Sequence, residues 1–122
     1  ATTFDVVSEK GEYLGGSIFP GVQISLEALF KNTAKLPRVD MTYPDKVIGK
    51  STVESLRSGA VYGFSGMVEA LVKQIKNELG QNARVIATGG IVDWIVTKTT
   101  VIDTIDPFLT LDGLRIIYEK NQ

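Results

Sequence analysis

The first third of the chain alternates apolar and polar residues in a way that predicts a β-hairpin followed by a helix. Residues 1–8 and 12–19 are rich in β-branched and aromatic residues and are separated by the turn SEKG. In the first strand, Phe4 and Val6 should face one side of the sheet and the intervening Asp5 the other, a solvated side. A helix should follow over residues 22–32, where apolar side chains recur at helical spacing.

The middle of the chain predicts a long connection and then a long helix. Residues 33–50 contain two prolines and no clear period, so we expect a surface loop. Ser51 and Glu54 form a capping-box pattern that should begin a helix over about 52–79, and Gly80 should end it. Three glycines interrupt this helix, at a cost of up to about 1 kcal/mol each relative to alanine. They therefore suggest close approach of another backbone, which is either the sheet or a second subunit: Gly59, Gly63 and Gly66.

The last third predicts two strands, each followed by a helix. ARVIATGG reads as a buried strand that ends in two glycines, and IVDWIV begins a short helix at or just after Ile91. VIDTID is a short alternating strand, and a helix follows Leu109. The apolar face of that final helix should consist of Leu111, Leu114, Ile117 and Tyr118. The order β-β-α-α-β-α-β-α indicates one α/β domain over residues 1–122, a mixed sheet with helices on its faces, although such sheets normally have about five strands rather than four.

The composition of the chain excludes several classes of partner and of catalytic or metal site. The net charge of −1 and the interspersed charges argue against a nucleic-acid or membrane partner. The chain contains neither Cys nor His, which rules out the usual zinc sites, Ser-His-Asp triads and Cys-His pairs within it. Any remaining chemistry must use carboxylates, Lys or Arg, hydroxyls, backbone amides or a hard cation bound by oxygen. Four aspartates near strands and prolines read as surface, cap or turn residues: Asp40, Asp45, Asp103 and Asp106.

The strongest local signal is VIATGG, in which a strand ends in Thr-Gly-Gly and turns into a helix. Such a turn lets a backbone approach a flat or anionic ligand, but it also serves as a simple tight turn, and Gly89–Gly90 alone do not decide between the two. A second pair, Gly15–Gly16, predicts a bulge or bend in its strand. Trp94 lies in a helix that is apolar on nearly every side, so it is either a core residue or an interface anchor.

Six segments together resemble the C-terminal half of type III pantothenate kinases. They are, in order, ATTFDVV, GGSIFPG, LEALFKNTAKLP, VIGKSTVESLRSG, VIATGG and DPFLTLDGLRIIYEKN, and the similarity spans essentially the whole chain. The resemblance implies one ribonuclease H-like domain, which is half of an actin-type ATPase fold. It further implies ATP-dependent phosphorylation of pantothenate in coenzyme A biosynthesis, a cytoplasmic homodimer, and a divalent metal and a monovalent cation in the full-length family.

The resemblance also assigns roles to individual positions. Ala1 would be the last residue of the second phosphate motif, with Thr2 following it, and Gly89 and Gly90 would lie against the adenosine. Thr52 would be presented to pantothenate in the partner subunit. The three helix glycines and Trp94 would belong to the dimer interface.

Several motifs that the family uses for catalysis have no match in this chain. The first phosphate loop, the catalytic Asp-Arg pair, the Asp-x-Gly-Thr of the second phosphate motif and the first strand of the domain's sheet have no counterpart in this sequence. We therefore expect no catalysis, no catalytic residues, no metal ligands and no cofactor for this chain alone, with the N-terminal half of the family as its missing partner. Two other hypotheses are an engineered or excised self-assembling structural module without catalysis, and a residual nucleotide-binding module that uses Gly89–Gly90.

Overall fold

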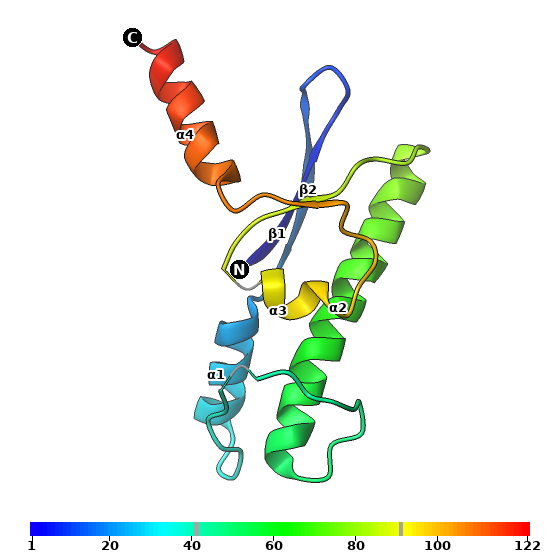
Figure 1. The fold of residues 1–122 in the computed structure, drawn as a ribbon, viewed down its shortest axis with the longest axis vertical. Helices are drawn as coiled ribbons and strands as arrows, with labels where there is room; N and C mark the ends of the chain where they lie inside the picture. Colours follow the sequence, from blue (N-terminus) through cyan, green and yellow to red (C-terminus); the bar gives the residue numbers. More distant parts are fainter. Residues whose placement is uncertain (41, 91) are drawn as a thin grey trace.

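The helices and strands follow one another in the order that the sequence predicts. In the computed structural model, the described residues are 1–40, 42–90 and 92–122, and residues 93 and 94 are described by their backbone alone. The chain forms β1 (Thr2–Val7), β2 (Tyr13–Phe19), α1 (Val22–Asn32), α2 (Thr52–Leu79), β3 (Ile86–Ala87), α3 (Val92–Val96), β4 (Thr104–Ile105) and α4 (Leu109–Lys120), arranged as in Figure 1. The predicted order is confirmed, although β3 and β4 have only two residues each.

Strands β1 and β2 form the predicted antiparallel hairpin. Its turn is closed by Ser8, whose side-chain oxygen accepts hydrogen bonds from two backbone N–H groups of the turn. The strand register shifts between Val6 and Val7, opposite Gly15, whose φ of 113° lies in the region that favours glycine. Gly16 is held by a different constraint, because a Cβ there would lie 1.8 Å from the carbonyl oxygen of Phe4. The predicted bulge at this glycine pair is thus confirmed.

Helix α2 is the centre of the fold. Its N-terminus is capped by Ser51, whose side chain accepts a hydrogen bond from the N–H of Glu54, and it ends at Gly80 with a φ of 69°. Its buried side chains pack against α1 and α3 and form the hydrophobic core, whose buried members are Val22, Ala60, Val61, Phe64, Val68, Val72 and Ile95. Partly buried Phe4 of β1 and Val85, just before β3, pack against the same cluster. One helix therefore holds both pairs of strands.

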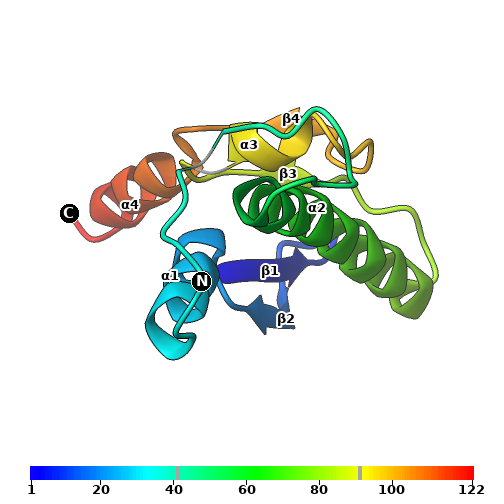
Figure 2. The same cartoon turned by 90° about the horizontal axis from the view of Figure 1, so that it is seen from below.

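The described strands form two separate sheets, and the prediction of one continuous sheet is wrong for this part of the chain. β1 pairs with β2, while β3 pairs in parallel with β4. Figure 2 shows the strands in the order β2, β1, β3, β4, with a wide space between β1 and β3 beside α2. Among the described residues, β1 forms backbone hydrogen bonds only with β2, and β3 forms them only with β4, so neither strand is paired along its second edge. The carbonyls of Val85 and Ala87 accept hydrogen bonds from the β4 segment, so the peptide groups of Ile86 point to the other edge.

The glycine positions of α2 face open space within this chain. A Cβ added at Gly59, Gly63 or Gly66 would meet nothing within 4 Å, and all three residues are exposed. No strand of the described chain approaches them, so the sheet is not the partner that the sequence left open. The second-subunit alternative stays a prediction.

Candidate functional site

The β3–α3 turn has the geometry that its two glycines suggested. Gly89 adopts a φ of 114°, which favours glycine, and its carbonyl accepts a hydrogen bond from the N–H of Val92 at 3.4 Å. Gly90 has an ordinary φ, but both glycines are exposed and a Cβ at either would meet nothing within 4 Å. Gly89 is therefore explained by the backbone alone. Gly90 adds an open strip of backbone that a flat ligand could approach.

The first residues of β1 lie away from this turn. The side-chain hydroxyl of Thr2 donates to the carbonyl of Pro20 at 3.4 Å, and a Cβ at Gly21 would lie 3.2 Å from the nitrogen of Ala1. Ala1 and Thr2 are thus tied to the β2–α1 junction. In Figure 2 the N-terminus and the β3–α3 turn lie on opposite sides of the space between the two sheets. The four predicted nucleotide-binding residues thus lie at two different places in the fold, Ala1 and Thr2 at the β2–α1 junction and Gly89 and Gly90 in the β3–α3 turn.

Thr52 is exposed in the first turn of α2, where the long connection joins the helix. The connection passes directly over this end, because the backbone N–H of Lys50 donates to the Glu54 carboxylate at 2.7 Å. Gly49 approaches even more closely, since a Cβ there would lie 2.5 Å from the Ser55 nitrogen. Contacts between the residues just before Thr52 and the residues just after it therefore hold this end of the helix in place.

Further along α2, two side chains hold the connection that precedes Thr52. The Ser58 hydroxyl donates to the carbonyl of Val47, and the Arg57 guanidinium forms an ion pair with Asp40. Hydrogen bonding to Arg57 is the main reason that the pKa of Asp40 lies below its usual value. We name this set of contacts, between residues 40–50 and 54–58, the loop clamp. The sequence does not predict the Asp40–Arg57 pair, because its members are seventeen positions apart and no spacing rule connects a loop to a helix face over that sequence separation.

The other predicted aspartates are placed as expected. The Asp103 carboxylate accepts a hydrogen bond from the N–H of Val85 at 2.7 Å, and that of Asp106 accepts one from the N–H of Phe108 at 3.0 Å. The Asp106 bond is a local turn interaction, as expected, whereas the Asp103 bond joins the two segments that lead into β3 and β4. Asp5 is exposed on the outer face of β1, where it accepts a hydrogen bond from the Tyr13 hydroxyl at 3.2 Å, and this bond raises the pKa of Tyr13.

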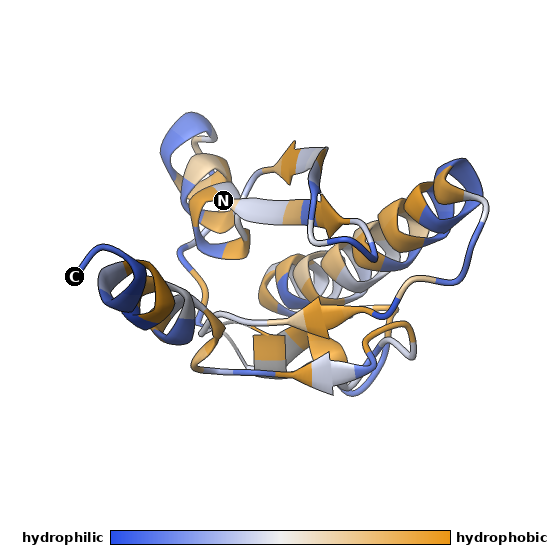
Figure 3. Cartoon of the chain, turned by 90° about the horizontal axis from the view of Figure 1, so that it is seen from above, coloured by the Kyte–Doolittle hydropathy of each residue, from blue (hydrophilic) through white to orange (hydrophobic). Residues whose placement is uncertain are grey.

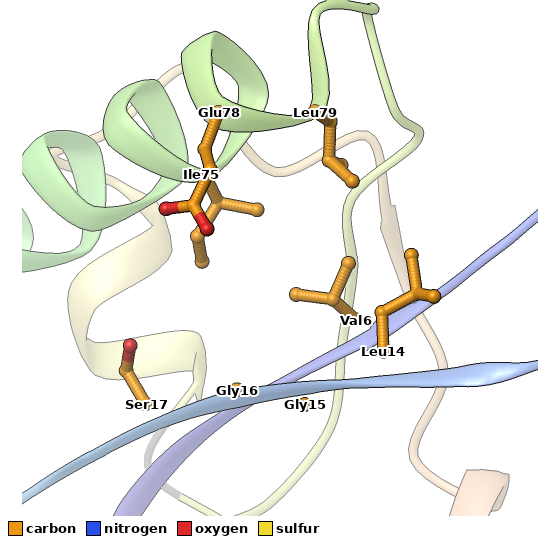
Figure 4. A pocket seen from close by; sticks show the side chains of 8 residues that line it. All are labelled: Val6, Leu14, Gly15, Gly16, Ser17, Ile75, Glu78 and Leu79. Carbon is orange, nitrogen blue, oxygen red and sulfur yellow. The ribbon is translucent and has the colours of Figure 1, made fainter.

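Two hollows on the described part of the surface lie away from the predicted site residues. The smaller, of about 140 Å³, lies between the C-terminal end of α2 and the β1–β2 hairpin, as Figure 4 shows. The larger, of about 330 Å³, is an open surface depression beside Arg84 and Asp103. Among the described residues there is no cluster of three or more potential metal-ligating carboxylates, and no helix is long and apolar enough to cross a membrane. The predicted interface role of Trp94 falls on a side chain outside the described part.

Comparisons with known proteins supply what the isolated geometry does not. A solved structure from Campylobacter jejuni, assigned to the Baf family of transcriptional activators, superposes with a TM-score of 0.67 at 18% sequence identity. It covers 98% of this chain but only 53% of the other chain, and at that identity it supports a shared fold alone. The observed fold is accordingly a small mixed α/β domain.

Several relatives with much higher sequence identity to this chain share the same name. The type III pantothenate kinases of Moorella thermoacetica, Myxococcus xanthus and Syntrophobacter fumaroxidans are 52%, 53% and 50% identical over 121 to 123 aligned residues. These alignments cover 99–100% of this chain and 47–48% of each relative, so the chain spans about half the length of the relatives it matches. The sequence model of the same family matches residues 1–74. The chain belongs to the type III pantothenate kinase family.

Proposed function

We propose that residues 1–122 form the C-terminal, ribonuclease H-like half of an ATP-dependent pantothenate kinase, and that this half transfers no phosphate by itself. One observation carries the proposal: relatives named type III pantothenate kinase match the whole chain at about half identity, yet extend to about twice its length. The kinase activity and a cytoplasmic location would then belong to the assembled protein.

The separation of the two sheets supports the finer assignment of the fold. The inner edges of β1 and β3 both lie beside α2, and the peptide groups of Ile86 point to an edge without a described partner. Free strand edges are reactive surfaces that proteins normally pair or cover. One extended segment from the other half, inserted between them, would give a five-stranded sheet of the ribonuclease H type.

The nucleotide would lie at the borders of that same space. Gly89 and Gly90 would contact the adenosine through bare backbone, and Ala1 and Thr2 would follow the phosphate-binding hairpin that the inserted strand completes. Phosphoryl transfer depends on positioning and on neutralising charge at the phosphates by cations. The metal and the monovalent cation that the resemblance implies would be bound in the assembled protein, together with groups of the other half.

Substrate binding would require a second subunit as well. Thr52 is exposed at the helix end that the loop clamp fixes, so it is free to reach a neighbouring molecule. The exposed glycine face of α2 leaves room for the backbone of a partner helix to approach. We therefore place the dimer contact along α2, with Thr52 of each subunit directed to the pantothenate of the other.

A coupled ATP and pantothenate assay tests this proposal. We define the chimera as the Moorella thermoacetica relative in which these 122 residues replace the matching segment. The chimera should turn over pantothenate, whereas the 122-residue chain alone should stay at background and bind ATP no more tightly than about millimolar by calorimetry. Turnover by the isolated chain would contradict the proposal, and so would a folded chimera without activity.

A self-assembling module without catalysis is a second candidate function. It is favoured by the unpaired strand edges and by exposed apolar side chains such as Ile18, which is 82% exposed. Light scattering would show assemblies larger than a dimer, in addition to the inactive chimera, if this candidate were correct.

A further inference from the structure

Helix α4 presents an uncovered apolar face. Four side chains occur at positions i, i+3, i+6 and i+7 and therefore share one side of the helix. We name them the α4 face: Leu111, Leu114, Ile117 and Tyr118. Each is 59–68% exposed, and none of the residues of α4 is buried. Figure 1 shows α4 extending away from the rest of the molecule.

The charged side chains next to the α4 face already pair with one another. Arg115 lies 3.7 Å from the carboxylate of Asp112 and 3.0 Å from that of Glu119, so the charges pair with one another along the helix. Such pairs are adapted to solvent and need no further partner. Figure 3 shows polar and apolar residues divided between different sides of this helix. The helix thus carries a stripe of paired charges beside an apolar face that has no partner among the described residues.

A helix of this length also needs tertiary support. Isolated helices shorter than about 12–15 residues are marginal in water, because nucleation is costly. The 12 residues of α4 bury no side chain in this chain, and Phe108 supplies no side-chain cap at its start. Covering the α4 face would therefore stabilise the helix as well as remove apolar surface from water.

The area of the face decides between the available partners. Four side chains of this size expose on the order of 400 Å², so a dimer made through α4 alone would bury on the order of 800 Å² in total, below the ~1,200 Å² of a stable interface. About half of each relative's length, in contrast, lies outside the matched segment and is sufficient for a second domain. A domain tethered in the same chain does not have to pay the full cost of association.

We propose that α4 is a docking arm: its α4 face packs onto the other domain of the same kinase chain and helps to hold the two halves together. This inference rests on the proposed function, because it takes the other domain to be the remaining half of the family's sequence. It assigns to α4 an interaction surface separate from the space between the sheets and from the glycine face of α2.

Hydrogen exchange on the 122-residue chain and on the chimera tests the docking. In the isolated chain the amides of α4 should exchange at nearly unprotected rates. In the chimera they should exchange at least about 100-fold more slowly, as expected for a helix protected by packing. Leu114→Glu should remove this protection, whereas the matched Glu119→Ala, outside the α4 face, should keep it.

If the Leu114→Glu chimera does not fold, a second measurement on a different variant still tests the docking. Tyr118→Trp should be quenched freely by iodide in the isolated chain and shielded in the chimera. Unprotected α4 amides together with a freely quenched tryptophan in a folded chimera would overturn the proposal, even if that chimera is an active kinase. Concentration-dependent protection of α4 in the isolated chain, together with dimers by light scattering, would instead assign the face to a second copy and would also overturn it.

Discussion

Replacing Gly63 by alanine should stabilise the folded monomer, although glycine is the residue that the family resemblance associates with the dimer interface. Gly63 lies in the interior of α2, where glycine costs about 0.8–1.0 kcal/mol relative to alanine. An added Cβ would meet nothing within 4 Å, so no steric penalty opposes this gain. We expect the free energy of unfolding to rise by about 0.8 kcal/mol, or roughly 3–5 °C in Tm for a domain of this size.

Urea unfolding followed by far-UV circular dichroism measures this change at a concentration where the chain is monomeric. The matched control is Ala70→Gly, at an exposed position of the same helix, which should lower stability by a similar amount. A loss of stability in Gly63→Ala with an unchanged m-value would refute the reasoning, because it would mean that a backbone already contacts this position within one chain.

The same substitution separates monomer stability from association. In a dimer whose helices approach through the glycine face, the new methyl group would lie between the two backbones. Sedimentation equilibrium should then show weaker association in Gly63→Ala while the monomer becomes more stable. Unchanged association would leave the stabilisation intact but would remove the dimer contact from this face.

Three further predictions concern the hairpin, the core and the loop clamp. Gly16→Ala should cost at least about 2 kcal/mol in urea unfolding, because its Cβ would collide with the Phe4 carbonyl, and a neutral result would contradict the described register. Phe64→Ala should cost about 3–5 kcal/mol in the same assay, because the ring is 8% exposed at the centre of the core. The Arg57 ion pair lowers the pKa of Asp40, so its stabilisation is present above the ordinary aspartate pKa of about 3.9 and is lost as the pH falls through the folded value. Asp40→Asn should remove that part of the acid sensitivity in a pH series of unfolding curves, and an identical pH profile would rule the pair out as its source.

Local signals in the sequence predicted the helices better than the strands. The bounds of α1 and α2 agree with the predicted ranges. For α2 the reason is that Ser51, Glu54 and Gly80 act through contacts within a few residues. β3 and β4 shrink to two residues each and do not join β1, because strand length depends on a neighbour that no local pattern specifies. The same limit applies to Asp40, which is exposed as predicted, but whose ion pair with Arg57 no local pattern specifies.

The candidate site was predictable in part, for a related reason. The positive φ of Gly89 follows from a strand that turns tightly into a helix, and the sequence indicates such a turn. The exposed position of Thr52 follows from its place after the helix cap. Sequence patterns could not tell that Ala1 belongs to a different sheet from the strand that leads to Gly90, since that depends on how two sheets pack on one helix.

The loop clamp has a consequence for the order in which the chain folds. Its contacts join residues only 4 to 17 positions apart, so closing these loops costs little entropy. Contacts of such short sequence separation form quickly, whereas the pairing of distant strands is slow. Residues 40–58 should therefore become ordered before β3 meets β4, and the helix end that carries Thr52 should be in place while the sheets are still assembling.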